Sequence, residues 1–171
     1  MGTVRQMIMI AITKLRAGLF ASLAVERWVD DVVRGAPFES VAQLLKVAAQ
    51  AATPLSAGEI EEAIAHHPRI GEKPVGDGAA KSFSRNEQAG LGRDLEDEAV
   101  TASLAAGNLS YEERFGRIFI IRAAGRTPAE ILAELERRIA LSSSTELEIV
   151  GEQLREIALL RIEKLWAVEL A

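Results

Sequence analysis

The fold class of this chain is decided by its longest periodic stretch, residues 144–168, which read STELEIVGEQLREIALLRIEKLWAV. Apolar residues that fall on one face of a helix recur along it: Leu147, Val150, Leu154, Ile157 and Leu165. Glu148, Glu152, Arg155 and Glu163 lie mostly on other faces, as on the solvent side of a surface helix. The stretch therefore predicts a long amphipathic helix that packs along a helical bundle.

Other stretches carry the same periodicity, and several start with residues that can bond the free amides of a first helical turn. Three segments have the spacing of a capping box, in which a hydroxyl and a carboxylate reciprocally bond backbone amides: Ser56–Glu59, Ser84–Glu87 and Ser110–Glu113. Thr127 is followed by proline at the first helical position. The predicted helices lie near residues 3–17, 20–33, 38–52, 56–66, 84–106, 110–115, 128–140 and 144–168.

These helices predict an all-α fold, a single-domain multi-helix bundle of about eight helices over residues 1–171. Two regions interrupt the pattern. Residues 67–83 contain two prolines and three glycines that forbid a continuous helix, so they predict a long loop. Residues 118–121, Ile-Phe-Ile-Ile, form a run too short for periodicity to distinguish a strand from a buried helix.

The composition excludes several classes of function. Apolar residues make up 49% of the chain and aromatic residues only 5%, which predicts an aliphatic core. The net charge is -5 and no basic run is present, so nucleic acid is not an expected partner. Cysteine is absent, which excludes thiol catalysis and fits a cytoplasmic location. No stretch approaches the roughly 18 apolar residues of a membrane span, so no membrane association is expected.

The two histidines of the chain are adjacent, and the second, His67, precedes Pro68. A residue before proline is disfavoured in the helical region, so the helix that starts near Ser56 should end here. The helix dipole would then favour the imidazolium form and make His67 a proton donor. The alternative is that both histidines only terminate a helix. A zinc site is less favoured, because zinc takes three or four protein ligands and neither cysteine nor a third histidine is available.

Glu87 also has two interpretations. The spacing from Ser84 explains it as half of a capping box, and Gln88 could be a solvated helix residue. A helix start of this kind could instead receive a carboxylate or a urea-like oxygen. Arg122 follows the apolar run and is expected to be buried, so it needs either a protein carboxylate or an anionic ligand as its partner.

Taken together and in order, these segments resemble the family of 2-oxo-4-hydroxy-4-carboxy-5-ureidoimidazoline (OHCU) decarboxylases. The resemblance covers nearly the whole chain, with residues 1–9 as a variable N-terminal extension. Its landmarks are His67-Pro-Arg-Ile-Gly-Glu-Lys-Pro74, Ser84-Arg-Asn-Glu-Gln-Ala-Gly90, Asn108, the segment from Tyr111 to Arg126, and the closing Glu- and Gln-rich helix. It implies cofactor-independent decarboxylation of OHCU to (S)-allantoin in urate catabolism, by a cytoplasmic protein that forms a homodimer and uses no metal.

The resemblance also implies roles for individual residues. His67 corresponds to the catalytic histidine and Glu87 to its acidic partner. The implied substrate contacts are Pro68, Ser84, Gln88, Phe119, Ile120, Ile121, Arg122 and Ala123. Two other functions remain open from the residues alone: a helical interaction module whose histidines are structural, and an isomerase or hydrolase that acts on a neighbouring ureide intermediate.

Overall fold

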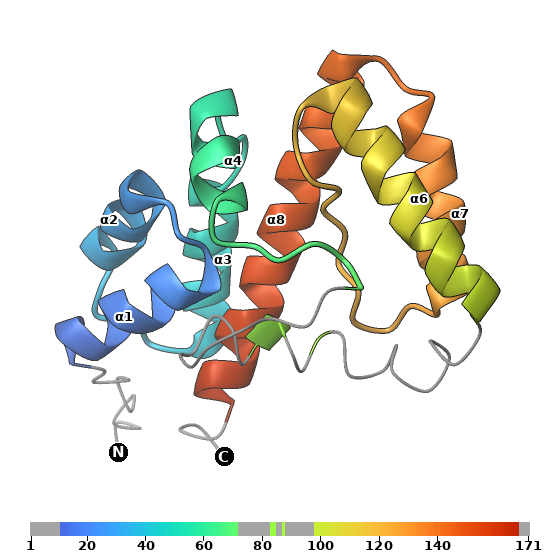
Figure 1. The fold of residues 1–171 in the computed structure, drawn as a ribbon. Helices are drawn as coiled ribbons and strands as arrows, with labels where there is room; N and C mark the ends of the chain where they lie inside the picture. Colours follow the sequence, from blue (N-terminus) through green and yellow to red (C-terminus); the bar gives the residue numbers. More distant parts are fainter. Residues whose placement is uncertain (1–10, 72–82, 85–86, 88–97, 168–171) are drawn as a thin grey trace, which may run out of the picture.

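The computed structural model describes residues 11–71, 83–84, 87 and 98–167, and these residues form an all-helical structure without a β-strand (Figure 1). The predicted fold class is confirmed. The helices whose bounds lie within the described residues are α1 (Ile12–Ser22), α2 (Glu26–Arg34), α3 (Val41–Ala51), α4 (Ala57–Ile64), α6 (Glu98–Phe115), α7 (Pro128–Ile139) and α8 (Ser143–Trp166). Phe83, Ser84 and Glu87 are helical as well.

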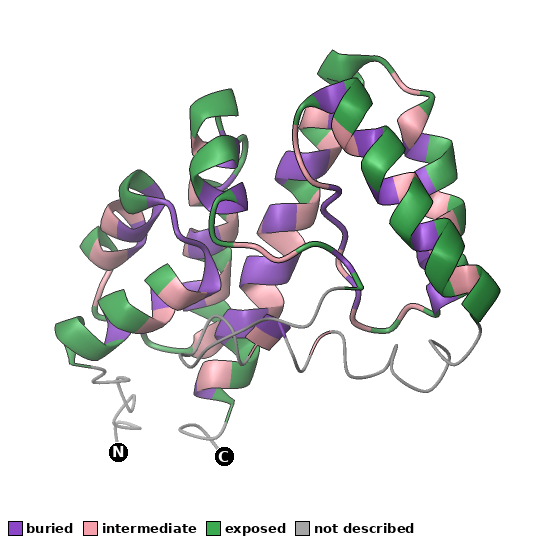
Figure 2. Ribbon diagram, in the orientation of Figure 1, coloured by how far each residue is buried: buried purple, intermediate pink, exposed green. Residues whose placement is uncertain are grey.

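Helix α8 runs through the middle of the molecule and separates two groups of helices (Figure 1). Helices α1, α3 and α4 pack against it on one side, with α2 against α1 and α3, and the α6–α7 pair lies on the other side. The apolar face predicted for α8 is buried, since Val150 and Leu154 are fully inaccessible to solvent (Figure 2). No helix in the described ranges is long and apolar enough to cross a membrane.

The buried side chains form two clusters. The larger contains residues from α1 to α4 and from α8, including Leu19, Trp28 and Trp166. The smaller joins α6 and α7 to residues of the connecting segment 116–127, including Phe119 and Ile121. Ile120 belongs to the larger cluster, so consecutive residues of this segment contribute to both cores. The connecting segment is therefore held from two sides.

The predicted capping box at α4 is confirmed, and α7 begins with a second capping box that was not among those predicted. The Ser56 hydroxyl accepts from the Glu59 amide at 3.2 Å, and the Glu59 carboxylate accepts from the Ser56 amide at 2.8 Å. Thr127 and Glu130 repeat the same pair of bonds. These local interactions fix where both helices begin.

Two boundaries predicted from the sequence are wrong. Helix α1 continues through Gly18 to Ser22. Gly18 is small for a packing reason, since an added Cβ would lie 2.9 Å from the Trp166 ring. Helix α6 continues through Ser110, which is exposed on an uninterrupted helix and starts no new one. Residues 118–123 are neither strand nor helix, and form an irregular, largely buried segment between α6 and α7.

Candidate active site

The site starts at the end of α4, where the chain leaves the helix at His67. The His67 amide donates to the Ile64 carbonyl at 2.9 Å, and Pro68 follows in non-helical backbone, as the sequence predicted. The His67 side chain is partly buried and lines a small pocket beside α8.

This pocket brings together most of the residues that the sequence singled out. Its walls come from the end of α4, the helical residues before Gln88, the segment between α6 and α7, and α8. The described residues that line it are His67, Pro68, Ile70, Ser84, Glu87, Phe119, Ile120, Ile121, Ala123 and Ile157. Segments separated by as much as ninety positions in the chain thus converge on one small cavity. Gln88 lies outside the described residues.

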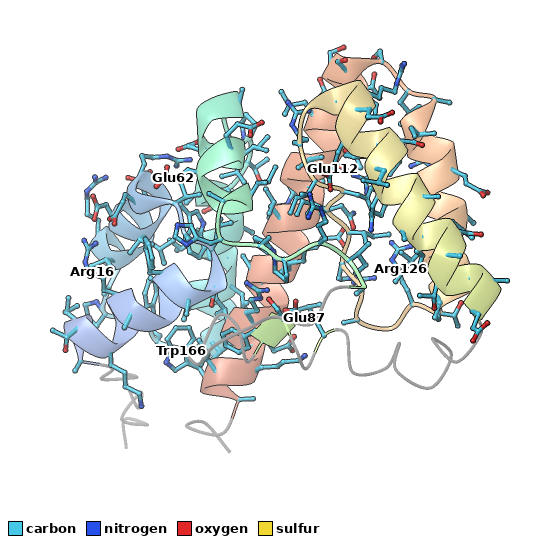
Figure 3. The ribbon with its side chains drawn as sticks, in the orientation of Figure 1. Arg16, Glu62, Glu87, Glu112, Arg126 and Trp166 are labelled. Atoms are coloured by element: carbon cyan, nitrogen blue, oxygen red, sulfur yellow. The ribbon has the colours of Figure 1, made fainter. Side chains whose placement is uncertain are left out.

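Glu87 is fixed in the pocket by Arg161 of α8. The guanidinium donates from Nε to one carboxylate oxygen at 2.7 Å and from Nη2 to the other at 3.0 Å. Both side chains are largely buried, with 4% of the Arg161 side chain and 12% of the Glu87 side chain exposed. Figure 3 shows Glu87 beside the lower part of α8. A bidentate pair of this kind fixes the orientation of the carboxylate.

Arg161 also connects the pocket to α1 and to Ser84. Its Nη2 donates to the Ser84 hydroxyl at 3.2 Å, and its Nη1 lies 3.4 Å from the Ser22 carbonyl oxygen. Its guanidinium carbon lies 5.6 Å from the centre of the Phe83 ring. Arg161 is therefore the residue that joins α1 and the 83–87 segment to the central helix.

The sequence analysis missed Arg161, although the sequence contains a signal for it. Leu154, Ile157 and Arg161 are spaced by three and four positions, so Arg161 lies on the apolar face of α8. A charged residue on a buried face needs a partner. Arg161 therefore meets this requirement for a buried partner better than Arg122 does.

The predicted imidazolium form of His67 is wrong for the free protein. The pKa of His67 is lowered from 6.5 to about 3, first because burial removes water from the charged ring. The positive charges of Arg161 and His66 lower this pKa further. Tertiary burial thus outweighs the helix dipole, and the imidazole is neutral near pH 7.

This low pKa predicts that the protein loses stability as the pH falls from about 6.5 towards 3. In that window the unfolded chain binds a proton at His67 and the folded chain does not, so acid favours unfolding. The loss should reach at most about 1.4 kcal/mol per pH unit. Urea unfolding of wild type and His67→Gln at pH 7, 6 and 5 measures it, and the variant should lose less stability than wild type.

His66→Gln is the matched control for this titration, because His66 is exposed and adjacent in sequence. It should reproduce the wild-type dependence of unfolding free energy on pH. If the unfolding free energy of His67→Gln fell with pH as steeply as that of wild type, the pKa of His67 would not be lowered in the folded protein.

Arg122 does not line the pocket with its side chain. The side chain is 38% exposed, so the expected burial of Arg122 is wrong, and its Nε lies 3.6 Å from a Glu156 carboxylate oxygen. Its backbone amide donates to Gln153 Oε1 at 2.9 Å. The protein carboxylate, one of the two partners considered from the sequence, is therefore the one observed.

Metal ligands are not clustered in the part of the chain that the structure describes. No group of three or more histidine, aspartate or glutamate side chains is placed there to hold a metal ion. His67 and Glu87 line the same pocket, but Glu87 is paired with Arg161.

Comparison with known proteins gives a consistent result. The family described as OHCU decarboxylase matches residues 11–163. The "2-oxo-4-hydroxy-4-carboxy-5-ureidoimidazoline decarboxylase" of Haloferax volcanii is 29% identical over 143 residues, which are 83% of each protein. The "Uric acid degradation bifunctional protein TTL" of Arabidopsis thaliana is 36% identical over 110 residues, and the match covers 62% of this chain and 33% of that protein.

A solved structure has the same fold. The "Crystal structure of OHCU decarboxylase in the presence of (S)-allantoin" aligns with a TM-score of 0.71 and 26% sequence identity, over 86% of this chain and 96% of that one. The family match spans most of the chain, and the relatives agree with it in sequence and in fold. This chain therefore belongs to the OHCU decarboxylase family, a family of carboxy-lyases.

Proposed function

We propose that this protein decarboxylates OHCU to (S)-allantoin without a cofactor, with His67 and Glu87 as its catalytic residues. The observation that carries the proposal is the convergence of His67, the Glu87–Arg161 pair and the segment 119–123 on one pocket. A helical interaction module has no reason to bring a neutral histidine and a paired carboxylate together in a cavity.

The reaction needs proton transfers and charge stabilisation. Loss of carbon dioxide breaks the bond between the carboxyl carbon and ring carbon 4. The electron pair of this bond forms a double bond between carbons 4 and 5, and the π electrons of the adjacent C=N bond move to its nitrogen. This nitrogen of the substrate ring then takes up a proton. The 4-hydroxyl of the resulting enol then loses its proton as carbon 5, which bears the ureido group, gains one. The substrate thus supplies its own electron sink, and the protein must move protons and fix one face of the ring.

A neutral His67 suits this sequence of steps. Its pKa of about 3 leaves a free nitrogen that can accept the proton of the substrate hydroxyl. The same ring, once protonated, can deliver a proton to carbon 5 on the face that it occupies. Delivery from one side explains a single enantiomer of allantoin. His67 thus acts first as a base and then as an acid.

Glu87 and the segment 119–123 would orient the substrate. The Glu87 carboxylate can accept hydrogen bonds from the ureido or hydroxyl group, since Arg161 fixes its orientation. Among the described residues neither the amide nor the carbonyl of Ile121 has a hydrogen-bond partner, although Ile121 is only 5% exposed. Buried backbone groups are rarely left unpaired, so this amide and carbonyl are suited to bind polar groups of the substrate. Pro68, Ser84, Ala123 and Gln88 complete the proposed contacts.

The test is turnover of freshly generated OHCU. Circular dichroism at the allantoin band should rise faster with the protein than without it, and carbon dioxide should be released in equal amount. Product formation without carbon dioxide would instead identify an isomerase or hydrolase of a neighbouring ureide. No rate enhancement over the spontaneous reaction would refute the proposed activity.

Metal removal should leave the activity unchanged. The chemistry proposed above uses only side chains and backbone groups of this chain, so dialysis against EDTA should retain at least about nine tenths of the initial rate. The rate is measured before and after treatment on the same sample. A loss of activity that zinc restores would overturn the metal-free mechanism.

We further propose that the chain acts as one domain over residues 1–171, as a homodimer in the cytoplasm. The family resemblance supports the dimer, and the absence of cysteine fits a reducing compartment. Light scattering after gel filtration should give twice the monomer mass. A monomer with full activity would refute a functional requirement for the dimer.

A further inference from the structure

A fully buried ion pair lies behind the pocket, between α7 and α8. Arg138 and Glu146 have no exposed side-chain surface. The Arg138 guanidinium donates to the Glu146 carboxylate from Nη2 at 2.5 Å and from Nε at 3.0 Å. The Tyr111 hydroxyl, from α6, donates to the same carboxylate. Burial raises the pKa of Tyr111, so this hydroxyl keeps its proton.

This cluster of Arg138, Glu146 and Tyr111 contacts two consecutive residues of the pocket wall. Arg138 Nη1 donates to the Ile120 carbonyl at 2.8 Å. Its guanidinium carbon lies 4.5 Å from the centre of the Phe119 ring, and the Tyr111 ring meets Phe119 edge-on at 5.2 Å. Phe119 is thus contacted by the arginine and by the tyrosine, while the next residue is held through its backbone.

Stability alone does not explain a buried ion pair. Removing two charges from water is costly, and apolar residues of similar volume often replace such pairs without loss of stability. An arginine fixes two acceptors relative to each other, because its donors lie in one plane and can bind a carboxylate and a carbonyl together. The segment 118–123 has no regular secondary structure to fix it, so its position depends on such contacts.

We propose that the Arg138–Glu146–Tyr111 cluster is a positioning group that sets the backbone of residues 119–123 for substrate binding. Arg138 holds the Ile120 carbonyl from one side of the segment, and Gln153 of α8 accepts from the Arg122 amide at 2.9 Å. These two bonds flank Ile121, whose amide and carbonyl have no partner among the described residues and can therefore bind a ligand. The inference rests on the proposed function only for the expected change in the KM for OHCU, and the expected change in amide exchange does not depend on it.

The test replaces the whole cluster by apolar residues, in the variant Tyr111→Phe/Arg138→Met/Glu146→Leu. No buried charge is left unpaired in it, so it is expected to fold with a urea midpoint close to that of wild type. Amide hydrogen exchange should become at least about tenfold faster at residues 119–123 and stay unchanged in the core of α8. The KM for OHCU should rise by about 10- to 100-fold, as a displaced binding group requires.

Arg137→Lys is the matched control, because Arg137 is the preceding residue and its ion pair with Glu134 is exposed. It should keep the wild-type exchange pattern and KM. Should the triple variant not fold, Arg138→Lys provides the same readouts, since lysine can neutralise Glu146 but lacks the separate nitrogens with which Arg138 donates to Glu146 and to the Ile120 carbonyl at once. Normal exchange at residues 119–123 in a folded variant would overturn the proposal. An inactive wild type would refute the enzymatic function instead, while amide exchange would still decide the positioning role.

Discussion

Replacing His67 with alanine is expected to lower kcat/KM for OHCU by about 10²- to 10⁴-fold, the usual contribution of a positioned acid–base group. His67 is the one neutral imidazole in the described pocket, and both proposed proton transfers depend on it. The backbone bond from its amide to Ile64 does not involve the side chain, so α4 should end as before. The rate is followed by circular dichroism at the allantoin band.

His66→Ala is the control for this substitution. His66 is exposed, and its ring makes an edge contact with Phe20 at 6.0 Å, outside the set of residues that line the pocket. It should keep the wild-type kcat/KM within about twofold. A folded His67→Ala protein with the rate of wild type would exclude His67 as the proton carrier and leave Glu87 as the remaining candidate.

The helical fold could be predicted because its signals are local. The apolar face of α8 and the capping boxes at Ser56 and Thr127 depend only on residues within a few positions of each other. The prediction of a helix start at Ser110 failed because this signal is local too. The spacing of a capping box also occurs in the middle of a helix. Tyr111 and Asn108 are both buried on α6, so tertiary packing keeps that helix continuous.

The charge state of the site could not be predicted in this way. A helix end favours protonated His67, but burial reverses this preference, and the charge of Arg161, 94 residues later in the chain, adds to the effect of burial. The partner of Glu87 is likewise determined by how α8 crosses the pocket. The family resemblance indicated residues that line the pocket, such as His67 and Glu87. The ion pair between Glu87 and Arg161 depends on tertiary structure.

The segment 118–123 shows a further limit. Its β-branched residues indicated burial, and Phe119, Ile120 and Ile121 are indeed buried. Neither regular structure considered for it forms, because its backbone bonds are made to side chains of α7 and α8. Such bonds have no periodicity that a sequence pattern could reveal.

Replacing Arg161 with methionine should destabilise the fold by about 3–5 kcal/mol, the usual cost of removing one partner from a buried ion pair. Methionine keeps much of the side-chain volume, so the loss arises from the Glu87 carboxylate, which is left buried without its two hydrogen bonds. Urea unfolding at pH 7 measures the change in unfolding free energy. Arg155→Met is the control on the same helix, since Arg155 bonds only the exposed Thr53 hydroxyl, and it should cost less than about 1 kcal/mol.

The double variant Glu87→Gln/Arg161→Met separates the ion pair from the packing of Arg161. If the uncompensated carboxylate causes the loss, removing its charge should restore most of the stability that Arg161→Met loses, with a coupling of about 1–3 kcal/mol between the two positions. The double variant should nevertheless remain inactive on OHCU, because the carboxylate proposed to orient the substrate is gone. Additive effects of the two substitutions on the unfolding free energy would mean that Arg161 stabilises the protein through its contacts with Ser22, Ser84 and Phe83. Glu87 would then depend on some other group for its position in the pocket.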